Sequence, residues 1–485
     1  MTVFEGRNYI NGRWQAAAAG QTFEQRNPAD LTVVTGRYAD STPPDAAAAI
    51  AAAEQAFPAW RALSPQSRKG YLDKALGQMI ARRDEIAALV TLENGKSLGE
   101  ARAEVDSAIK EMDFQIAEGI RMTGQTMPVE VAGTLAYSKR EALGPVGIIT
   151  PWNFPFNVPC RKCTPALMAG NTVVLKPASL TPRIGLLYTE LLGETGLPPG
   201  VINCVTGSGR AVGSPIVADP RIKAISFTGS TPVGKSIQAE AAQNLTPTQL
   251  DLGGKNPAIV MPDADLDLAV AAIVKGAYAC SGQWCTSTSR VIVLEEIAAE
   301  LTDRLIETTS QLRLHEGTHA DCGMGPVCGA AQKRDILDYI RQGQEEGARL
   351  LLGGQAVEDG EYARGCFVAP TIFDQVTPDM TIAREEIFGP VLVIISVTSF
   401  DAAVKVANDV AYGLSSSIFT RDLGQALSYM ERAEVGLAHV NLMSALKEPQ
   451  LPFGGVKASG AGLPEAGSSG IEFFTEHKVC YVKYR

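Results

Sequence analysis

The chain contains little of what disulfide-stabilised, metal-dependent or triad-type enzymes need. It has only four histidines in 485 residues, and its nine cysteines are an odd number scattered along the chain. Such a set is not a disulfide framework, so we interpret the cysteines as thiols in a reducing compartment. The few histidines disfavour a Ser-His-Asp hydrolase. We expect no metal requirement.

Positive charge and long hydrophobic runs are also scarce. The chain has 43 Lys and Arg against 53 Asp and Glu, a formal net charge of −10. Nucleic-acid binding needs clustered cations, so we expect no nucleic-acid partner. The beginning, MTVFEGRNYINGRW, lacks a basic segment followed by an apolar core, and no later run reaches about 18 apolar residues. We therefore expect a cytoplasmic protein that binds no membrane.

Length and patterning predict a multidomain α/β protein. Single cores stop growing near roughly 250 to 300 residues, so this chain needs at least two packed units. Residues 45–120 alternate helical stretches with short breaks, such as Asn94-Gly95 after the amphipathic run 84–93. Short apolar runs follow at 146–150, 172–176, 201–205 and 224–227. Such runs between helices are typical of a parallel sheet covered on both faces.

A second set of strand-like runs indicates a second α/β unit. These runs lie at 258–261, 290–294, 391–396 and 415–419, with helical stretches such as 297–313 and 331–348 between them. DLGGKNP at 251–257 is a turn-rich stretch suited to the junction of the two units. The final segment, 471–484, ends in the alternating pattern of an exposed strand. It either closes a local sheet or pairs with another subunit, and we favour the subunit contact.

The motif GQWCT at 282–286 is the sharpest chemical signal. Cys285 follows a Gly-containing turn and precedes a Thr/Ser stretch, outside any apolar periodic run. A thiolate in such a turn can attack an aldehyde carbon; a hydride can then leave to a nicotinamide, and the resulting thioester is hydrolysed. A lone cysteine is more often a packing residue, so this interpretation needs support from other motifs.

Three other motifs offer groups that such chemistry requires. PWNFP at 151–155 places Asn153 after a strand, where its amide can stabilise an oxyanion or merely bond its own backbone. LKPAS at 175–179 places Lys176 at the carboxyl end of the next strand, within reach of a cofactor ribose. FTGSTPVGK at 227–235 gives a strand, a Gly-Ser turn and a helix start that suit a pyrophosphate, although it lacks GxGxxG.

Taken in order, these motifs resemble those of the aldehyde dehydrogenase superfamily over essentially the whole chain. LGGK at 252–255, EEIFGPV at 385–391 and PFGGVKASG at 452–460 support the resemblance. It implies an α/β fold with two open parallel units, one a Rossmann-like cofactor unit and one catalytic, plus a small β oligomerisation arm. The implied domains are 1–123 with 143–250 for the cofactor, 251–460 for catalysis, and 124–142 with 469–485 for the arm of a homodimer or homotetramer.

The resemblance also implies roles for individual residues. Cys285 would be the nucleophile and Asn153 the oxyanion donor. The other implied residues would bind NAD or NADP: Trp152 in the cofactor groove, Lys176 at the adenosine ribose, Gly229, Ser230 and Gly234 over the pyrophosphate, and Glu386 with Phe388 at the nicotinamide ribose.

One position departs from the family pattern. The family normally has Glu before LGG as the general base for thioester hydrolysis, whereas this chain has Asp251. The shorter side chain loses one methylene of reach, so we expect Asp251 to act through a water, with slower deacylation. Glu465, which aligns approximately with an acidic residue lining the family's water path, is the weaker candidate for the base.

Two further positions bear on substrate and cofactor. Arg161, eight residues after Asn153, resembles an arginine that grips the distal carboxylate in succinate-semialdehyde dehydrogenases; the alternative is a surface Arg beside Lys162. GQWCTSTSRVIV is similar to the 2-oxoglutarate-semialdehyde type. We therefore predict oxidation of an ω-semialdehyde carboxylate. Ser179 stands where NAD-preferring members often have Glu, which slightly favours NADP.

Two rival functions remain open on the sequence alone. In a CoA-acylating dehydrogenase a thiol rather than water would take the acyl group, and Asp251 keeps that possibility alive. A non-catalytic binding or structural protein on the same scaffold is disfavoured by the retained Cys285, Asn153, Lys176 and Glu386.

Overall fold

The computed structural model describes residues 3–485 and begins with a small sheet beside a layer of helices. The sheet has the order β1-β5-β4, with bounds Phe4–Gly6, Asp30–Ala39 and Thr22–Asn27. The helices that follow are α1 (Pro43–Ala62), α2 (Pro65–Ala81), α3 (Arg83–Asn94) and α4 (Leu98–Gly119). Helix α3 ends where Asn94-Gly95 predicts, because Gly95 adopts a left-handed φ of 94°.

The first predicted α/β unit is built on an eight-stranded sheet. Its order is β22-β12-β11-β8-β9-β10-β2-β3. The four expected runs form its parallel centre: β8 (Pro145–Ile149), β9 (Thr172–Lys176), β10 (Ile202–Cys204) and β11 (Ala224–Thr228). The other strands are β12 (Thr248–Asp251), β22 (Gly460–Ala461), β2 (Asn8–Ile10) and β3 (Arg13–Gln15), and the connecting helices are α5 (Asn157–Ala169), α6 (Pro182–Gly193), α7 (Ser214–Ala218) and α8 (Thr231–Ala241). All residues of the four central strands are buried, as expected for strands covered on both faces.

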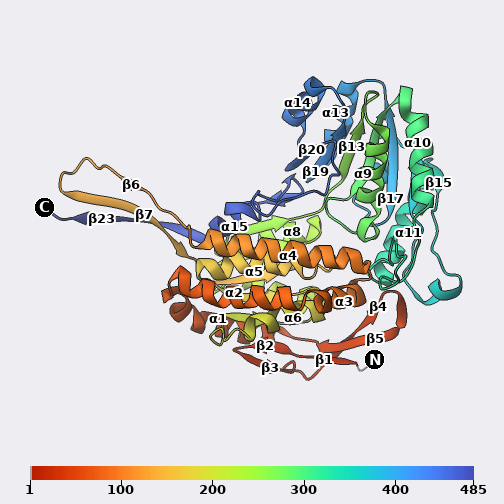
Figure 1. Ribbon diagram of the computed structural model, residues 1–485. Helices are drawn as coiled ribbons and strands as arrows, with labels where there is room; N and C mark the ends of the chain where they lie inside the picture. Colours follow the sequence, from red (N-terminus) through yellow and green to blue (C-terminus); the bar gives the residue numbers. More distant parts are fainter. Residues whose placement is uncertain (1–2) are drawn as a thin grey trace.

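The second unit has a seven-stranded sheet of order β15-β16-β17-β14-β13-β19-β20. These strands are β15 (Arg349–Leu352), β16 (Thr371–Asp374), β17 (Val391–Val397), β14 (Thr288–Leu294), β13 (Asn256–Val260), β19 (Ser415–Phe419) and β20 (Leu437–Val440). Its helices are α9 (Leu266–Tyr278), α10 (Glu295–Ser310), α11 (Ala330–Glu345), α12 (Thr381–Arg384), α13 (Phe400–Asn408) and α14 (Leu423–Arg432). Figure 1 shows this unit stacked above the layer formed by α2 to α5.

The junction between the two sheets is short and carries a predicted site residue. Strand β12 of the first sheet ends at Asp251, and strand β13 of the second begins at Asn256. The C-terminal motif PFGGVKASG also lies at this junction, because Gly460 of β22 pairs with Asp251 of β12. A side chain at the end of β12 therefore lies where the two units meet.

The predicted arm is a three-stranded antiparallel sheet that projects from the body (Figure 1). Strand β23 (Thr475–Lys483) pairs along its whole length with β7 (Thr134–Ala142), which also pairs with β6 (Thr126–Met127). The exposed final strand thus closes a sheet within its own chain, the first of the two alternatives. Residues 467–473 before it form helix α15 (Gly467–Phe473), so the strand starts later than the segment 471–484. The subunit contact remains a prediction.

Several other expectations concern what the chain lacks. Within residues 3–485, no helix is both long and apolar enough to cross a membrane. Over the same residues no cluster of three His, Cys, Asp or Glu side chains could hold a metal ion. All nine cysteines are free. Residues 1 and 2 lie outside the described residues. They belong to the predicted cofactor range 1–123 and to the initial segment MTVFEGRNYINGRW.

Candidate active site

Cys285 follows a strained turn between α9 and β14. Cys280 and Ser281 have φ angles of 51° and 57°, and Gly282 has 69°, so three consecutive residues are left-handed. Non-glycine residues rarely adopt this region, and strain of this kind concentrates at functional sites. A side chain at position 282 would collide with the backbone of Gly389. Packing therefore fixes the turn, and Cys285 emerges from it half-buried.

The main chain around Cys285 is held by the domain junction. The Nδ2 atom of Asn256, the first residue of β13, donates to the carbonyl oxygens of Cys285 and Ser287, both at 2.8 Å. A side chain at Gly254 would collide with the Cys285 carbonyl, so the junction passes close to the nucleophile. The LGGK motif thus positions Cys285 through its backbone.

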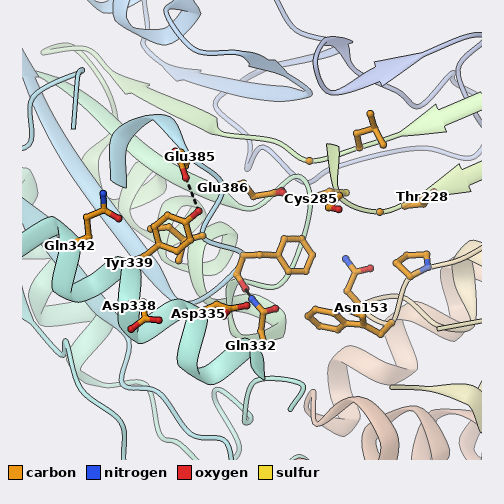
Figure 2. A pocket seen from close by; sticks show the side chains of 18 residues that line it. Asn153, Thr228, Cys285, Gln332, Asp335, Asp338, Tyr339, Gln342, Glu385 and Glu386 are labelled. Carbon is orange, nitrogen blue, oxygen red and sulfur yellow. Dashed lines mark hydrogen bonds between the residues drawn. The ribbon is translucent and has the colours of Figure 1, made fainter. Parts of the chain in front are cut away.

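Two cavities meet at Cys285. The outer cavity, of about 570 Å³, is lined by Trp152, Gly229, Ser230, Glu386 and Phe388 among others (Figure 2). The inner cavity, of about 290 Å³, is lined by Arg161, Asp251, Trp284, Lys447 and Phe453 among others. Cys285, Asn153 and Thr228 line both cavities. The predicted nucleophile and oxyanion donor therefore stand between a cofactor-sized space and a smaller one.

Asn153 is held rigidly in the loop before α5. The Lys96 ammonium donates to its carbonyl oxygen at 2.6 Å and pairs with Glu104 at 2.7 Å. The Asn153 amide Nδ2 donates to the carbonyl of Gln283 at 3.1 Å, which leaves its second N–H free. Figure 2 shows the amide on the wall opposite Cys285, pointing toward it. This geometry suits an oxyanion donor.

Five of the eight predicted cofactor residues line the outer cavity. The Trp152 and Phe388 rings meet edge to face at 5.4 Å. Glu386 accepts the backbone N–H of Gly254 at 2.9 Å, and burial raises the pKa of its carboxyl to about 7. A side chain at Gly253 would collide with the Glu386 carboxylate. Helix α8 begins beside Gly229 and Ser230, and the Ser230 side chain makes no cap hydrogen bond, so the first N–H groups of the helix are available to an anion.

Lys176, Ser179 and Gly234 do not line the outer cavity. Lys176 is the last residue of β9, and its buried ammonium donates to the carbonyl of Pro177 at 2.9 Å. Burial lowers the pKa of Lys176 to about 8. Ser179 donates to the carbonyl of Gly207 at 2.9 Å, after the neighbouring strand β10. These residues lie at the carboxyl edge of the sheet that holds Trp152, as an extended dinucleotide would require. Gly234 lies in α8, where a side chain would strike Leu252.

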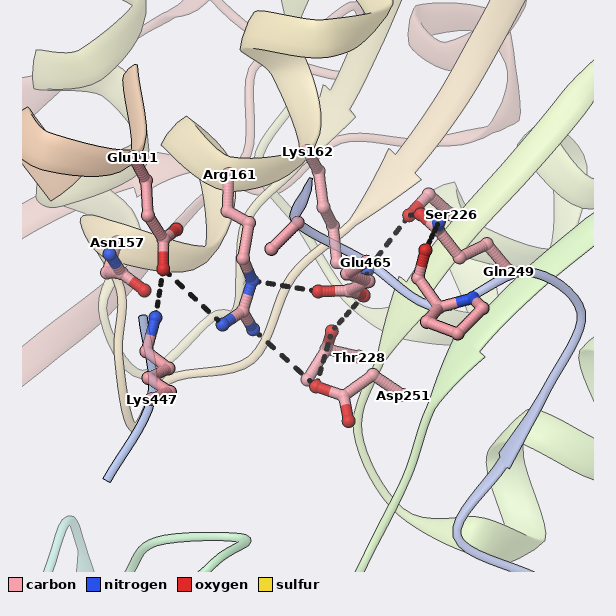
Figure 3. Close-up of polar contacts among 12 residues, drawn as sticks. Glu111, Asn157, Arg161, Lys162, Ser226, Thr228, Gln249, Asp251, Lys447 and Glu465 are labelled. Carbon is pink, nitrogen blue, oxygen red and sulfur yellow. Dashed lines mark hydrogen bonds and ion pairs between the residues drawn. The ribbon is translucent and has the colours of Figure 1, made fainter. Parts of the chain in front are cut away.

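Arg161 is buried in α5, not on the surface. Its Nε lies 2.8 Å from Oε2 of Glu465, Nη2 lies 3.6 Å from Oδ2 of Asp251, and Nη1 lies 4.0 Å from Oε1 of Glu111 (Figure 3). Nε has no partner in hydrogen-bond geometry, and the other two contacts exceed hydrogen-bond length. The guanidinium therefore lies among three carboxylates without a hydrogen bond to any of them, and it lines the inner cavity.

The two candidate bases differ in their surroundings. Glu465 forms an ion pair with Lys162 and accepts from Thr228 at 3.2 Å. Although burial opposes ionisation, the charges of Lys162 and Arg161 hold the pKa of Glu465 below its ordinary value. Burial and the neighbouring Glu465 raise the pKa of Asp251 to about 7, and its Oδ1 has no hydrogen-bond partner. Oε2 of Glu465 also lacks a hydrogen bond, but it lies 2.8 Å from Nε of Arg161, so the charges around the two carboxyls favour Asp251 as the base.

Comparison with known proteins decides the family. The model of the aldehyde dehydrogenase family matches residues 14–480. The chain belongs to the aldehyde dehydrogenase family. It is 43% identical to the alpha-ketoglutaric semialdehyde dehydrogenase of Bacillus subtilis. The alignment spans 476 residues, 98% of each chain.

Solved structures agree with this assignment. An Escherichia coli structure described as an NADP-dependent enzyme superposes with a TM-score of 0.95 at 35% identity, over 99% of this chain and 98% of that one. Betaine aldehyde dehydrogenase of Staphylococcus aureus, in complex with NAD⁺, gives a TM-score of 0.96 at 32% identity, over 99% and 94%. The α/β aldehyde dehydrogenase fold is confirmed, and the protein is a nicotinamide-dependent aldehyde dehydrogenase.

Sequence reasoning about this aldehyde dehydrogenase missed part of its polar site. Lys162, Thr228, Glu111 and Lys447 were not predicted as site residues, yet each contacts Asp251, Glu465 or Arg161 or shares a partner with them. One signal was available: two adjacent cations lie in the mostly uncharged segment NVPCRKCTPALMA, which forms α5 and is buried at all thirteen positions. Nothing local marks Glu111 or Lys447.

Proposed function

We propose that this aldehyde dehydrogenase oxidises an ω-semialdehyde carboxylate, with 2-oxoglutarate semialdehyde as the preferred substrate and succinic semialdehyde as a second one. The observation that carries the proposal is Arg161, only 5% exposed, whose guanidinium makes no hydrogen bond and lines the inner cavity together with Cys285. A buried planar fork of donors matches a carboxylate. The Bacillus subtilis relative, named for the same substrate class, supports the choice.

The chemistry follows from the order of groups along the two cavities. The Cys285 sulfur attacks the aldehyde carbon, and the Asn153 amide with the Cys285 backbone N–H stabilises the resulting oxyanion. When bound, the nicotinamide supplies the hydride acceptor. Loss of hydride from the thiohemiacetal carbon leaves a thioester on Cys285. Asp251 then takes a proton from water as the water oxygen attacks the thioester carbonyl, the carbon–sulfur bond breaks, and the acid is released.

The resting thiol must lose its proton before it attacks. Burial, reinforced by the charge of Asp251, raises the pKa of Cys285 well above its ordinary value. The nucleophile is therefore a thiol before it reacts. The thiol proton leaves to solvent before the attack, and Asp251, with its unpartnered Oδ1, accepts the proton of the hydrolytic water.

The same proposal includes NADP as a well-used cofactor alongside NAD. Ser179 is small and neutral, so it would not repel a 2′-phosphate, and Lys176, at the end of the strand that precedes Ser179, could pair with the phosphate. In this proposal the acceptor of the acyl group is water rather than CoA, because Asp251 is buried beside Glu465 and Thr228 and can serve as the base. The exposed apolar residues of the arm support assembly into a homodimer or homotetramer; they are Met127, Val131, Leu135, Val479, Tyr481 and Val482.

Substitution of Arg161 tests the substrate class. Arg161→Lys keeps the charge that Glu465 and Asp251 require but loses the bidentate fork. We expect kcat/KM to fall at least about tenfold for 2-oxoglutarate and succinic semialdehydes, since a charge-assisted pair contributes about 1.5–3 kcal/mol. A neutral aliphatic aldehyde should lose less than about threefold. Steady-state NAD(P)H formation at 340 nm with each aldehyde, with and without CoA, measures both; equal losses for all aldehydes would refute the carboxylate contact.

A further inference from the structure

Two lysines line the inner cavity besides Arg161: the exposed Lys275 of α9, and Lys447, which pairs with a carboxylate beside Arg161. Lys447, in the loop between β20 and the PFGGVKASG motif, forms an ion pair with Glu111 of α4. Glu111 lies on the same side of Arg161, with Oε1 at 4.0 Å from Nη1 (Figure 3). Both cations also lie over the ring of Phe453, Arg161 at 4.6 Å and Lys447 at 5.8 Å from its centroid. Two cations from distant segments of the chain therefore both lie near the Glu111 carboxylate and over the Phe453 ring.

The surroundings of Lys447 differ from those of a core ion pair. Its side chain is 20% exposed and lines the inner cavity, whereas Glu111 is 3% exposed. Glu111 is its only hydrogen-bond acceptor among residues 3–485, and an ammonium carries three donors. The second oxygen of Glu111, Oε2, is buried without a partner. Lys447 is thus anchored by one donor and presents the others to the cavity.

We propose that Lys447 is a second substrate-binding residue, which donates to the 2-oxo group of the substrate while Arg161 binds the adjacent carboxylate. This inference rests on the proposed function, because it takes the carboxylate at Arg161 as given. A 2-oxo acid presents a carboxylate fork and, next to it, one ketone oxygen. A planar guanidinium fits the fork, and a compact ammonium fits the single oxygen. Glu111 is the positioning residue that holds Lys447 through their ion pair.

The assignment predicts specificity within the carboxylate class. A semialdehyde acid without the 2-oxo group would satisfy Arg161 but leave the free donors of Lys447 without an acceptor, and unsatisfied donors in a site reject the analogue that lacks the group. 2-Oxoglutarate and glutarate form a matched pair, since both are five-carbon dicarboxylates that differ only in the 2-oxo oxygen. Their relative affinity for the inner cavity isolates the contact with Lys447.

The test is competitive inhibition by 2-oxoglutarate and by glutarate during oxidation of a neutral aliphatic aldehyde. In the unaltered enzyme we expect 2-oxoglutarate to bind about tenfold more tightly than glutarate. Lys447→Met should bring the ratio of inhibition constants to within about twofold of unity. Lys333→Met is the matched control: Lys333 also pairs with one carboxylate, Glu358 at 3.0 Å, and lines neither cavity. It should keep the ratio.

Three results separate the possible failures. A ratio near unity in the unaltered enzyme overturns the role of Lys447, and this holds even if Lys447→Met does not fold. A ratio unchanged in a folded Lys447→Met variant overturns it as well, and leaves Lys447 as the counter-ion of Glu111. If neither dicarboxylate inhibits better than a neutral amide of the same length, the carboxylate site at Arg161 fails and the proposed function fails with it.

Discussion

Replacement of Asp251 by Asn should separate the two halves of the reaction. The substitution keeps the size of the side chain and its contact with Thr228, whose Oγ1 lies 3.4 Å from Oδ2. It removes the one carboxyl of the two candidate bases whose pKa is raised. Acylation requires Cys285 and Asn153, which both remain. Hydrolysis requires the base.

The expected size of the effect follows from this role. A positioned general base contributes typically 10²–10⁴-fold, so steady turnover should fall by about that factor. One equivalent of NAD(P)H per active site should still appear as a burst. In the unaltered enzyme, the pKa of about 7 makes Asp251 about nine-tenths deprotonated at pH 8 and about one-tenth at pH 6. Because only the deprotonated form accepts a proton, the hydrolytic rate should fall about tenfold as the pH drops between these values.

Stopped-flow absorbance at 340 nm resolves the burst from the steady phase. Asp251→Glu, which restores the usual family side chain, should recover turnover and serves as the control. Glu465→Gln tests the competing base and should leave the burst-to-steady ratio close to that of the unaltered enzyme. Steady turnover of Asp251→Asn within about threefold of normal, or a burst created by Glu465→Gln alone, would refute Asp251 as the base.

Two further predictions concern the cofactor and the arm. Ser179→Glu should lower kcat/KM for NADP by more than about tenfold, because the new charge repels the 2′-phosphate. The kcat/KM for NAD should be retained. Equal changes with both cofactors, measured by initial rates, would show that position 179 does not face the ribose. Val479→Lys combined with Tyr481→Lys places two charges on one face of exposed strand β23 and should reduce the particle mass measured by light scattering. An unchanged mass would mean that the arm makes no subunit contact through that face.

The backbone of the site was more predictable than its polar network. Strands β8, β9 and β11 lie within about one residue of the expected runs, because continuous apolar segments bounded by turns leave little choice of structure. The short first sheet, β1, β4 and β5, was not predicted, since its strands mix buried and exposed positions without clean alternation. Local pattern therefore located the two parallel units but not the small sheet beside them.

The network depends on contacts that no local pattern contains. Glu111, Arg161, Lys447 and Glu465 come from helix α4, helix α5 and two C-terminal loops, and they meet only after both units have packed. Arg161 was predicted from a family resemblance, while its neighbour Lys162 was considered only as a sign of surface exposure. Both side chains are buried, and Lys162 holds Glu465 in place.

Charge balance explains how this interior tolerates so many ionised groups. Arg161, Lys162 and Lys447 face Glu111, Asp251 and Glu465, which gives three cations for three carboxylates. Removing one partner of a buried pair leaves an uncompensated charge and costs about 3–5 kcal/mol, so a neutral variant at position 161 would confuse lost binding with lost folding. Arg161→Lys keeps the balance and changes only the geometry of the donors. For the same reason, the informative quantity for Lys447 is the ratio of the inhibition constants of 2-oxoglutarate and glutarate, not the absolute activity. A general loss of structure weakens the binding of both inhibitors. Their ratio then still reports the contact with the 2-oxo oxygen.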